Sequence, residues 1–175
     1  SEIEDVVRRA RELLERLRKR VREVVEDIRR STEEHKEKSE RVVKTSEELN
    51  KRLEDELVRD KDLLKKVKDE SKKLNDELRR LSEENSKRNE ELIKRIEKLV
   101  DDVAERIKEI EKMLRDGVDV DKVLEDVRRL VKEAVDRIDK ILRDSRESDR
   151  RADEEIKKVL DRNRELVKKV ADEDT

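Results

Sequence analysis

The sequence predicts an all-α protein, a long antiparallel up-down-up three-helix bundle with left-handed coiled-coil packing. Composition is the first reason: 58% of the 175 residues are charged, one is Gly, and none is Pro, Cys or aromatic. An average globular domain is about 25% charged, and this excess of charge with helical periodicity is typical of long helices. The second reason is a heptad spacing of apolar residues. The third is a pair of breaks, near residues 58–60 and 117–119, that divide the chain into three nearly equal segments.

The same composition excludes several other classes of protein. High charge with only 31% hydrophobic residues is also typical of disorder, but the regular apolar spacing favours helices. The net charge of −2, with acids and bases interleaved, provides no basic surface for nucleic acid. No apolar run approaches the roughly 18 residues of a membrane span, and the acidic start does not resemble a signal peptide. We therefore expect a soluble chain with no nucleic-acid or membrane partner; its localisation is unknown, although cytoplasmic expression is compatible.

The first helix is predicted over about residues 2–57 from the spacing of its inward positions. Apolar residues follow steps of three and four, as in a heptad repeat, at Ile3, Val7, Ala10, Leu14, Leu17, Val21, Val24 and Ile28. The same spacing continues through Ser31, His35, Val42, Leu49, Leu53 and Leu57. Polar residues therefore occupy inward positions in the middle of this helix.

The second and third helices are predicted over about residues 61–116 and 120–173. Gly117 is placed to terminate one helix at its C′ position, and Asp119 is placed to cap the next. The earlier break is inferred from phase, because the apolar grids before and after residues 58–60 are out of register, and Asp60 can serve as the N-cap. One uninterrupted helix from Ile3 to Asp116 is the alternative. Short loops would fold residues 1–175 into a single rod-like domain.

Polar residues at inward positions are predicted to meet in two layers. In an antiparallel bundle, residues of the first two helices lie level when their numbers sum to about 118, and those of the last two when they sum to about 236. The first layer comprises Ser31, His35, Ser82, Asn85, Ser86, Asn89, Ser145 and Ser148. The second comprises Thr45, Ser46, Ser71, Asn75 and Asn163. Because an unpaired buried hydroxyl or amide costs about 1–3 kcal/mol, we expect paired networks that set register and specificity.

Apolar residues are distributed unevenly between the two ends of the predicted bundle. Residues 3–28, 92–114 and 120–142 are rich in Val, Ile and Leu, whereas the segments at the other end are sparser. The first end is therefore predicted to be the more stable.

The only histidine, His35, invites three interpretations. A metal site is disfavoured, because bundle metal sites use Glu-x-x-His and Thr32 stands where the Glu would be. A pH switch is open, since protonation would turn a ring acceptor into a donor and disrupt a network. The simplest interpretation is a histidine satisfied within the network. The stretch from Arg29 to Thr32 also resembles a kinase site, but Ser31 is expected to face inward.

No pattern in the sequence indicates catalysis. There is no Cys, no Ser-His-acid set with evident geometry, and no Gly-rich phosphate loop. We therefore expect no enzyme activity, no cofactor, no metal and no small-molecule substrate.

The chain resembles computationally designed helical bundles that carry buried hydrogen-bond networks. The resemblance lies in three near-equal helices, the Asp116-Gly117-Val118-Asp119 loop, surfaces rich in Glu, Lys and Arg, and the Ser, Thr, Asn and His layers. Membership of that class implies a structural scaffold whose polar layers set register and specificity.

An interaction module is the alternative function. Extra apolar residues crowd beside the core positions of the third helix, at Val118, Val123, Leu130, Val135 and Leu142. A stripe this wide could receive a further helix, from another chain or a second copy, in a groove. Such a module would be a component of a heterodimer, a switch or a homo-oligomer.

Overall fold

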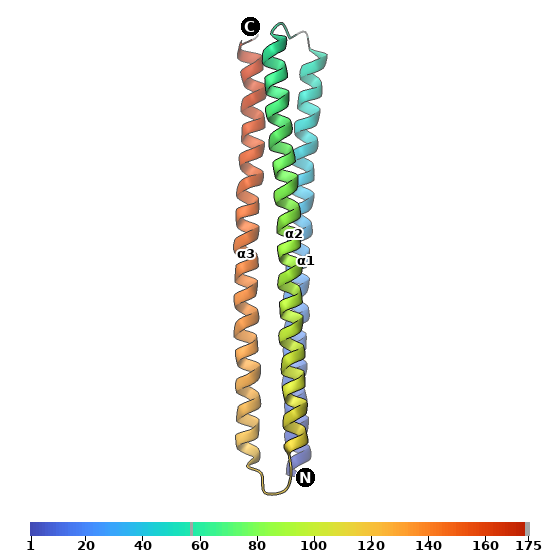
Figure 1. The fold of residues 1–175 in the computed structure, drawn as a ribbon, viewed down its shortest axis with the longest axis vertical. Coiled ribbons are helices and arrows are strands. Elements are labelled where there is room, and N and C mark those ends of the chain that lie inside the picture. Colours follow the sequence, from blue (N-terminus) through green and yellow to red (C-terminus); the bar gives the residue numbers. More distant parts are fainter. Residues whose placement is uncertain (57, 174–175) are drawn as a thin grey trace. The chain divides into compact units, whose positions relative to one another are not determined.

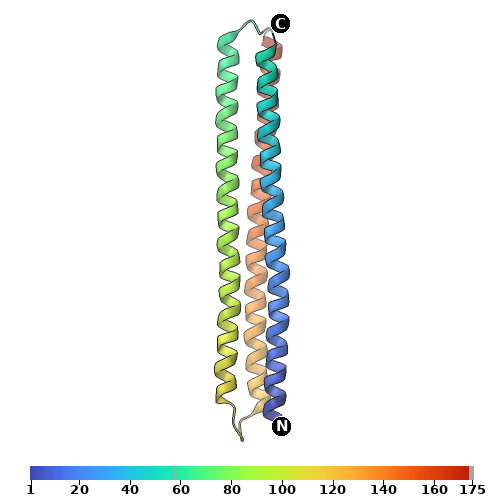
Figure 2. The ribbon, with the colours of Figure 1, turned by 90° about the vertical axis from the view of Figure 1, so that its right-hand side faces the viewer.

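Three long helices make up the protein, as the sequence predicts. A computed structural model describes residues 1–56 and 58–173, and within them lie α1 (Glu2–Asp55), α2 (Lys61–Met113) and α3 (Val120–Glu173) (Figure 1). The described residues contain no strand. Consecutive helices run in opposite directions (Figures 1 and 2), and every pair of helices is in contact. The predicted all-α three-helix bundle is confirmed, and left-handed coiled-coil packing stays a prediction.

The chain divides into two compact units. Unit 1 comprises Ser1–Arg29 and Asn89–Arg146, and unit 2 comprises Arg30–Arg88 and Glu147–Thr175, apart from the residues outside the described part. Each unit contains a stretch of all three helices. The single domain over residues 1–175 stays a prediction.

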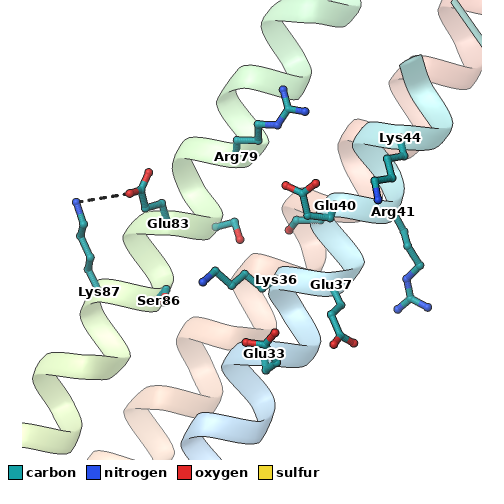
Figure 3. A pocket seen from close by; sticks show the side chains of 12 residues that line it. Glu33, Lys36, Glu37, Glu40, Arg41, Lys44, Arg79, Glu83, Ser86 and Lys87 are labelled. Atoms are coloured by element: carbon teal, nitrogen blue, oxygen red, sulfur yellow. Dashed lines mark ion pairs between the residues drawn. The ribbon is translucent and has the colours of Figure 1, made fainter. Parts of the chain in front are cut away.

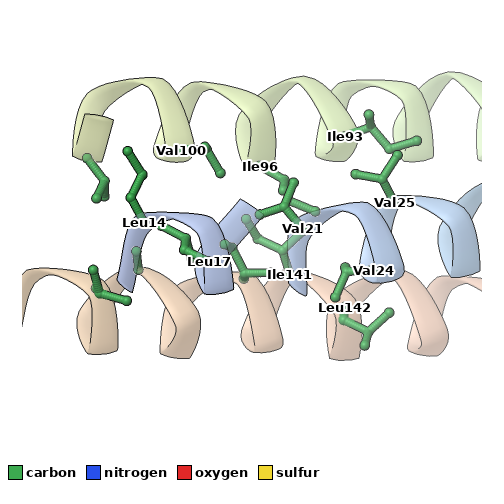
Figure 4. Packing of buried hydrophobic residues seen from close by; sticks show 14 of the residues in the cluster. Leu14, Leu17, Val21, Val24, Val25, Ile93, Ile96, Val100, Ile141 and Leu142 are labelled. Carbon is green, nitrogen blue, oxygen red and sulfur yellow. The ribbon is translucent and has the colours of Figure 1, made fainter. Parts of the chain in front are cut away.

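Unit 1 is held together by one large apolar cluster. Side chains from all three helices interdigitate there (Figure 4), and Val24, Ile96 and Ile138 are completely buried. The cluster continues along each helix because the apolar residues recur on one face every three or four positions. Burial of a Val, Leu or Ile side chain contributes about 1.5–3 kcal/mol, so this cluster dominates the stability of unit 1.

Unit 2 has two smaller apolar clusters. One contains Val42, Val43, Leu78, Ile156 and Val159. The other contains Leu53, Val58, Leu64, Val67, Leu166 and Val170. Leu57, which belongs to the predicted apolar stripe, lies outside the described residues. The intervening inward positions are polar, so polar contacts make up a larger share of the interior of unit 2.

The loop between α1 and α2 forms without Gly or Pro. α1 ends at Asp55; the predicted end at residue 57 lies outside the described residues. Asp60 caps α2, because its Oδ1 accepts a hydrogen bond from the backbone N–H of Leu63 at 3.0 Å. Val58 is buried beside Leu64 and anchors the loop to the apolar cluster. The predicted break near 58–60 is confirmed, and the alternative of one uninterrupted helix is wrong.

The second loop begins earlier than predicted. α2 ends at Met113 rather than at residue 116, and α3 begins at Val120 as expected. Gly117, with φ of 89°, stands at the third position of a turn in which Val118 N–H donates to the Arg115 carbonyl at 3.2 Å. Gly117 therefore serves a β-turn rather than the C′ position of α2. Asp119 accepts from the Lys122 N–H at 3.3 Å and caps α3 as predicted.

Candidate functional site: the buried polar networks

The Asn163 network joins all three helices inside unit 2. Its members are Ser46 and Asn50 of α1, Ser71 and Asn75 of α2, and Asn163 of α3. All except the half-buried Asn50 are at most 3% exposed. Buried polar groups of this kind are tolerated only when they are hydrogen-bonded, so the geometry of the network decides whether it stabilises the bundle.

The hydrogen bonds of this network close into a ring. Ser71 Oγ donates its single proton to Asn163 Oδ1 at 2.9 Å, so the Ser46 hydroxyl must be the donor in its 2.8 Å contact with Ser71. Asn163 Nδ2 donates to Asn75 Oδ1 at 3.3 Å, and Asn75 Nδ2 donates back to Ser46 Oγ at 3.1 Å. Asn50 Nδ2 adds a further bond to Ser71 Oγ at 2.8 Å. All ring bonds point the same way round, an arrangement in which each bond polarises the next.

The Asp149 network is the second polar assembly of unit 2. Asp149, only 5% exposed, accepts from Ser31 Oγ at 2.5 Å through Oδ2 and from Asn85 Nδ2 at 3.3 Å through Oδ1. Ser148 Oγ donates to Asn85 Oδ1 at 2.8 Å and accepts from Arg88 Nη1 at 2.7 Å. A chain of donors thus leads from the guanidinium of Arg88 to the carboxylate of Asp149, and it connects opposite charges on α2 and α3.

His35 lies beside the Asp149 network and contacts two acceptors. Its Nδ1 is 2.7 Å from the Ser31 carbonyl oxygen, and its Nε2 is 2.9 Å from Asp153 Oδ1. The second contact has the distance of an ion pair without the alignment of a hydrogen bond, and Nε2 has no hydrogen-bond partner among the described residues. Lys38 Nζ approaches the same Asp153 oxygen at 3.6 Å. The residue is 7% exposed, whereas the Asp153 side chain that faces it is 47% exposed.

Unit 1 contains one buried polar pair, and both of its residues belong to the first predicted layer. Ser145 Oγ donates to Asn89 Oδ1 at 3.0 Å, and each residue is 1% exposed. The pair joins α2 to α3 within unit 1.

Most members of the predicted layers hydrogen-bond to one another, in separate groups. The structure brings together Ser31, Asn85 and Ser148; Asn89 and Ser145; and Ser46, Ser71, Asn75 and Asn163. Their pairings lie within about a turn of the predicted register.

Three predicted network members lie elsewhere. Thr45 is exposed, while Ser82 and Ser86 are half-buried and line a groove. In the described part of the chain no network hydrogen bond involves these three side chains. Each follows or precedes an inward position by one residue, and a helix turns about 100° per residue, which is enough to move a side chain out of the core.

The predicted layers leave out four residues that contact network members, namely Asn50, Arg88, Asp149 and Asp153, and one further buried serine, Ser39. Arg88, Asp149 and Asp153 are charged residues among many, and nothing in their spacing separates them from surface charges. Ser39, 4% exposed, is an inward serine that the heptad spacing could have indicated, since it lies four residues after His35.

The groove lined by Ser39, Ser82 and Ser86 lies between α1 and α2 in unit 2 (Figure 3). It has a volume of about 850 Å³, and its other lining residues are charged. Those charges alternate in sign, as in Glu33, Lys36 and Glu37 along α1 and Arg79, Glu83 and Lys87 along α2. Lys87 and Glu83 pair at 4.0 Å (Figure 3), so the groove favours neither an anion nor a cation.

Exposed ion pairs account for the pKa shifts of Glu147, Arg150 and Arg80. A hydrogen bond from Arg150 lowers the pKa of Glu147, and the same contact raises the pKa of Arg150, which also faces Glu154. Hydrogen bonding to Glu77 likewise raises the pKa of Arg80. These residues lie three or four apart on helix surfaces, where such pairs stabilise a helix by a few tenths of a kcal/mol. They describe a solvated surface and provide no acid–base pair within a cleft.

Two further observations bear on the type of site. Among the described residues, no three His, Cys, Asp or Glu side chains are grouped in a way that could hold a metal ion. No helix in the described ranges has a stretch apolar and long enough to cross a membrane.

Comparisons with protein-family models, curated proteins and solved structures found no match. The buried polar networks are therefore the features of the chain that bear on its function.

Proposed function

We propose that the chain is a non-catalytic structural scaffold of the designed helical-bundle class, in which the buried polar networks select how the helices pair. The single observation that supports this proposal is the closed ring formed by Ser46, Ser71, Asn163 and Asn75. A ring that takes donors and acceptors from three helices fits one register of those helices.

Apolar contacts alone discriminate poorly between registers. The heptad spacing repeats along each helix, so sliding one helix by a heptad replaces Val and Leu contacts with similar ones. The same slide separates Asn163 from Ser71 and Asn75 and leaves buried amides without partners. Each unpaired group costs about 1–3 kcal/mol, and this penalty against wrong pairings is the proposed role of the ring.

The test replaces the ring as a whole and then in part. In the fourfold variant Ser46→Ala, Ser71→Ala, Asn75→Leu and Asn163→Leu, we expect unchanged or raised thermal stability together with loss of a single conformation. Loss of uniqueness would be seen as extra amide signals in a nitrogen–proton correlation spectrum, or as several species in sedimentation. The partial control, Asn163→Leu alone, should destabilise the protein because Ser71 and Asn75 lose their partner. A fourfold variant with one sharp set of signals and one species would contradict the proposal.

A second candidate function, an interaction module, is favoured by an apolar groove in unit 1. This groove of about 660 Å³ lies between α2 and α3. Met113, 67% exposed, stands beside Val123 and Leu130, two of the residues that crowd α3. Arg106, Asp126 and Glu133 flank the groove with both signs of charge. An amphipathic helix with an apolar stripe between mixed charges is the partner that fits these features.

The oligomeric state distinguishes self-association from the scaffold alone. Light scattering after size exclusion should give about 21.1 kDa at all concentrations for a monomer, and a higher mass at high concentration for a self-associating chain. If self-association uses the groove, Leu130→Glu should abolish the higher mass. The matched control is Arg128→Glu, on the same helix and outside the groove. A mass unchanged by Leu130→Glu would exclude the groove as the interface.

A further inference from the structure

The serine groove of unit 2, formed by Ser39, Ser82, Ser86 and the charged residues around them, contains three hydroxyls without partners. Ser39 is 4% exposed, and Ser82 and Ser86 are half-buried. Among the described residues, none of these hydroxyls takes part in a hydrogen bond. Hydroxyls buried to this degree usually have a partner, so the floor of the groove offers donors and acceptors to whatever binds there.

The charged residues that follow α1 along the groove are unpaired as well (Figure 3). They are Glu33, Lys36, Glu37, Glu40, Arg41 and Lys44. None of the six makes an ion pair within the described part of the chain. Beyond the groove, α2 does bridge to α1, through Arg79 with Glu47 and through Lys68 with Glu54. The charges of α1 beside the groove are therefore left for a molecule outside the bundle.

The order of these six charges is self-complementary. When two copies of one helix meet in opposite directions, residues lie opposite each other when their numbers have a constant sum. A sum of about 77 places an acid opposite a base every time: Glu33 with Lys44, Lys36 with Glu40, and Glu37 with Arg41. A second copy running in the same direction would instead oppose like charges.

Pairing within one helix is the other use that such charges can have. Lys36 and Glu40 are four residues apart, as are Glu37 and Arg41, and this spacing suits an ion pair along a helix. The structure forms neither pair among the described residues. The same residues thus remain available to a reversed second copy.

We propose that the serine groove binds a second copy of the chain, with the two α1 helices antiparallel about a twofold axis near residues 38 and 39. The contact is isologous, because the same surface is used on both sides. Ser39 lies beside the axis, where its hydroxyl gains donors and acceptors from the second copy. This dimer goes beyond the scaffold function and does not depend on it, and it uses a different groove from the apolar one in unit 1.

The proposed dimer is weak and electrostatic. Exposed ion pairs contribute little singly, and the charged stretch covers only about three turns of α1. Dimers therefore form at high protein concentration, and added salt weakens them because it screens exposed charges.

Sedimentation equilibrium over a range of protein concentrations tests the contact. At low ionic strength we expect the average mass to rise above 21.1 kDa toward the mass of a dimer. In about 1 M salt, where the Debye length is about 3 Å, it should stay at the monomer value. Arg41→Glu with Lys44→Glu should raise the dissociation constant at least about tenfold, because acids then oppose acids. The matched control, Lys157→Glu with Arg164→Glu, changes the net charge equally at exposed positions of α3 and should associate like the unchanged chain.

A charge-exchange variant separates pairing from net charge. It reverses two acids and two bases together, as Glu33→Lys, Glu37→Arg, Arg41→Glu and Lys44→Glu. The net charge of the chain is unchanged, and every reversed residue again faces the opposite sign in an antiparallel dimer. This variant should regain the association that the double variant loses.

An unchanged chain that stays monomeric at low salt would overturn the proposal. So would a dimer that persists in Arg41→Glu with Lys44→Glu, or a charge-exchange variant that stays monomeric while circular dichroism shows it to be as helical as the unchanged chain. Leu130→Glu, in the apolar groove of unit 1, should leave this dimer intact. Loss of the dimer on that substitution alone would assign it to the other groove and overturn the assignment to the serine groove.

Discussion

At the scale of single residues, the buried carboxylate of Asp149 depends strongly on its hydrogen-bond partners. It is a carboxylate with 5% exposure, and burying a charge is costly unless hydrogen bonds and an opposite charge compensate. Ser31 and Asn85 donate to its two oxygens, and Ser148 connects Asn85 to the cation of Arg88. Each of these groups is satisfied by its neighbours, so removal of one exposes the others to the cost of burial.

We therefore predict that Asp149→Ala destabilises the protein by about 1–3 kcal/mol, because the Ser31 hydroxyl and the Asn85 amide lose their acceptor. Urea unfolding monitored by circular dichroism would measure the change. Asp161→Ala, at an exposed position of the same helix, is the control and should stay within about 0.5 kcal/mol of the original stability. Equal effects of the two substitutions would show that the network contributes nothing beyond helix propensity.

The residue scale also shows what the sequence could reveal about the candidate site. Ser46, Ser71 and Asn163 were predictable because polar residues interrupt a regular apolar stripe. Asp149 was not, because acids and bases make up 58% of the chain and a buried carboxylate looks like any other. Thr45 was predicted to face inward and is exposed, because an error of one residue in helical phase separates an inward side chain from an exposed one.

At the scale of elements, the ends of the helices depend on short-range chemistry. The caps at Asp60 and Asp119 were predictable because a carboxylate before a helix satisfies the first free N–H groups. The end of α2 was not, because a C′ position and a β-turn both require the positive φ that Gly117 adopts. The sequence therefore identified the loop and misplaced the last residues of the helix.

Gly117→Ala is predicted to cost about 1–2 kcal/mol, the usual penalty for an L-residue in the left-handed region. An added Cβ would meet no atom within 4 Å, so the cost arises from the backbone conformation alone. Asp116→Ala is the matched substitution in the same turn, at a residue without positive φ, and should have little effect. Thermal unfolding of the two variants would measure the difference, and equal melting temperatures would contradict the assignment of strain to Gly117.

At the scale of the whole molecule, the two units differ in how they are stabilised. Unit 1 has a single large apolar cluster and one buried polar pair, whereas unit 2 has two smaller apolar clusters and both polar networks. Hydrogen bonds contribute less net stability per buried group than apolar burial, because they replace bonds to water. Unit 2 thus has more of the polar contacts that select one pairing of the helices, and less of the apolar burial that stabilises the folded state.

Amide hydrogen exchange should therefore be slower at residues 15–25 in unit 1 than at residues 65–75 in unit 2, after correction for intrinsic rates. Local opening costs least where few apolar contacts must break, and residues 65–75 lie between a small apolar cluster and the Asn163 network. Residues 92–103 provide an internal control, because they belong to α2 as residues 65–75 do but lie in unit 1. Slow exchange at residues 15–25 and 92–103 with fast exchange at 65–75 would assign the difference to the units rather than to the helices. Equal protection of the three segments would mean that the units unfold together, and that the polar networks do not lower the local stability of unit 2.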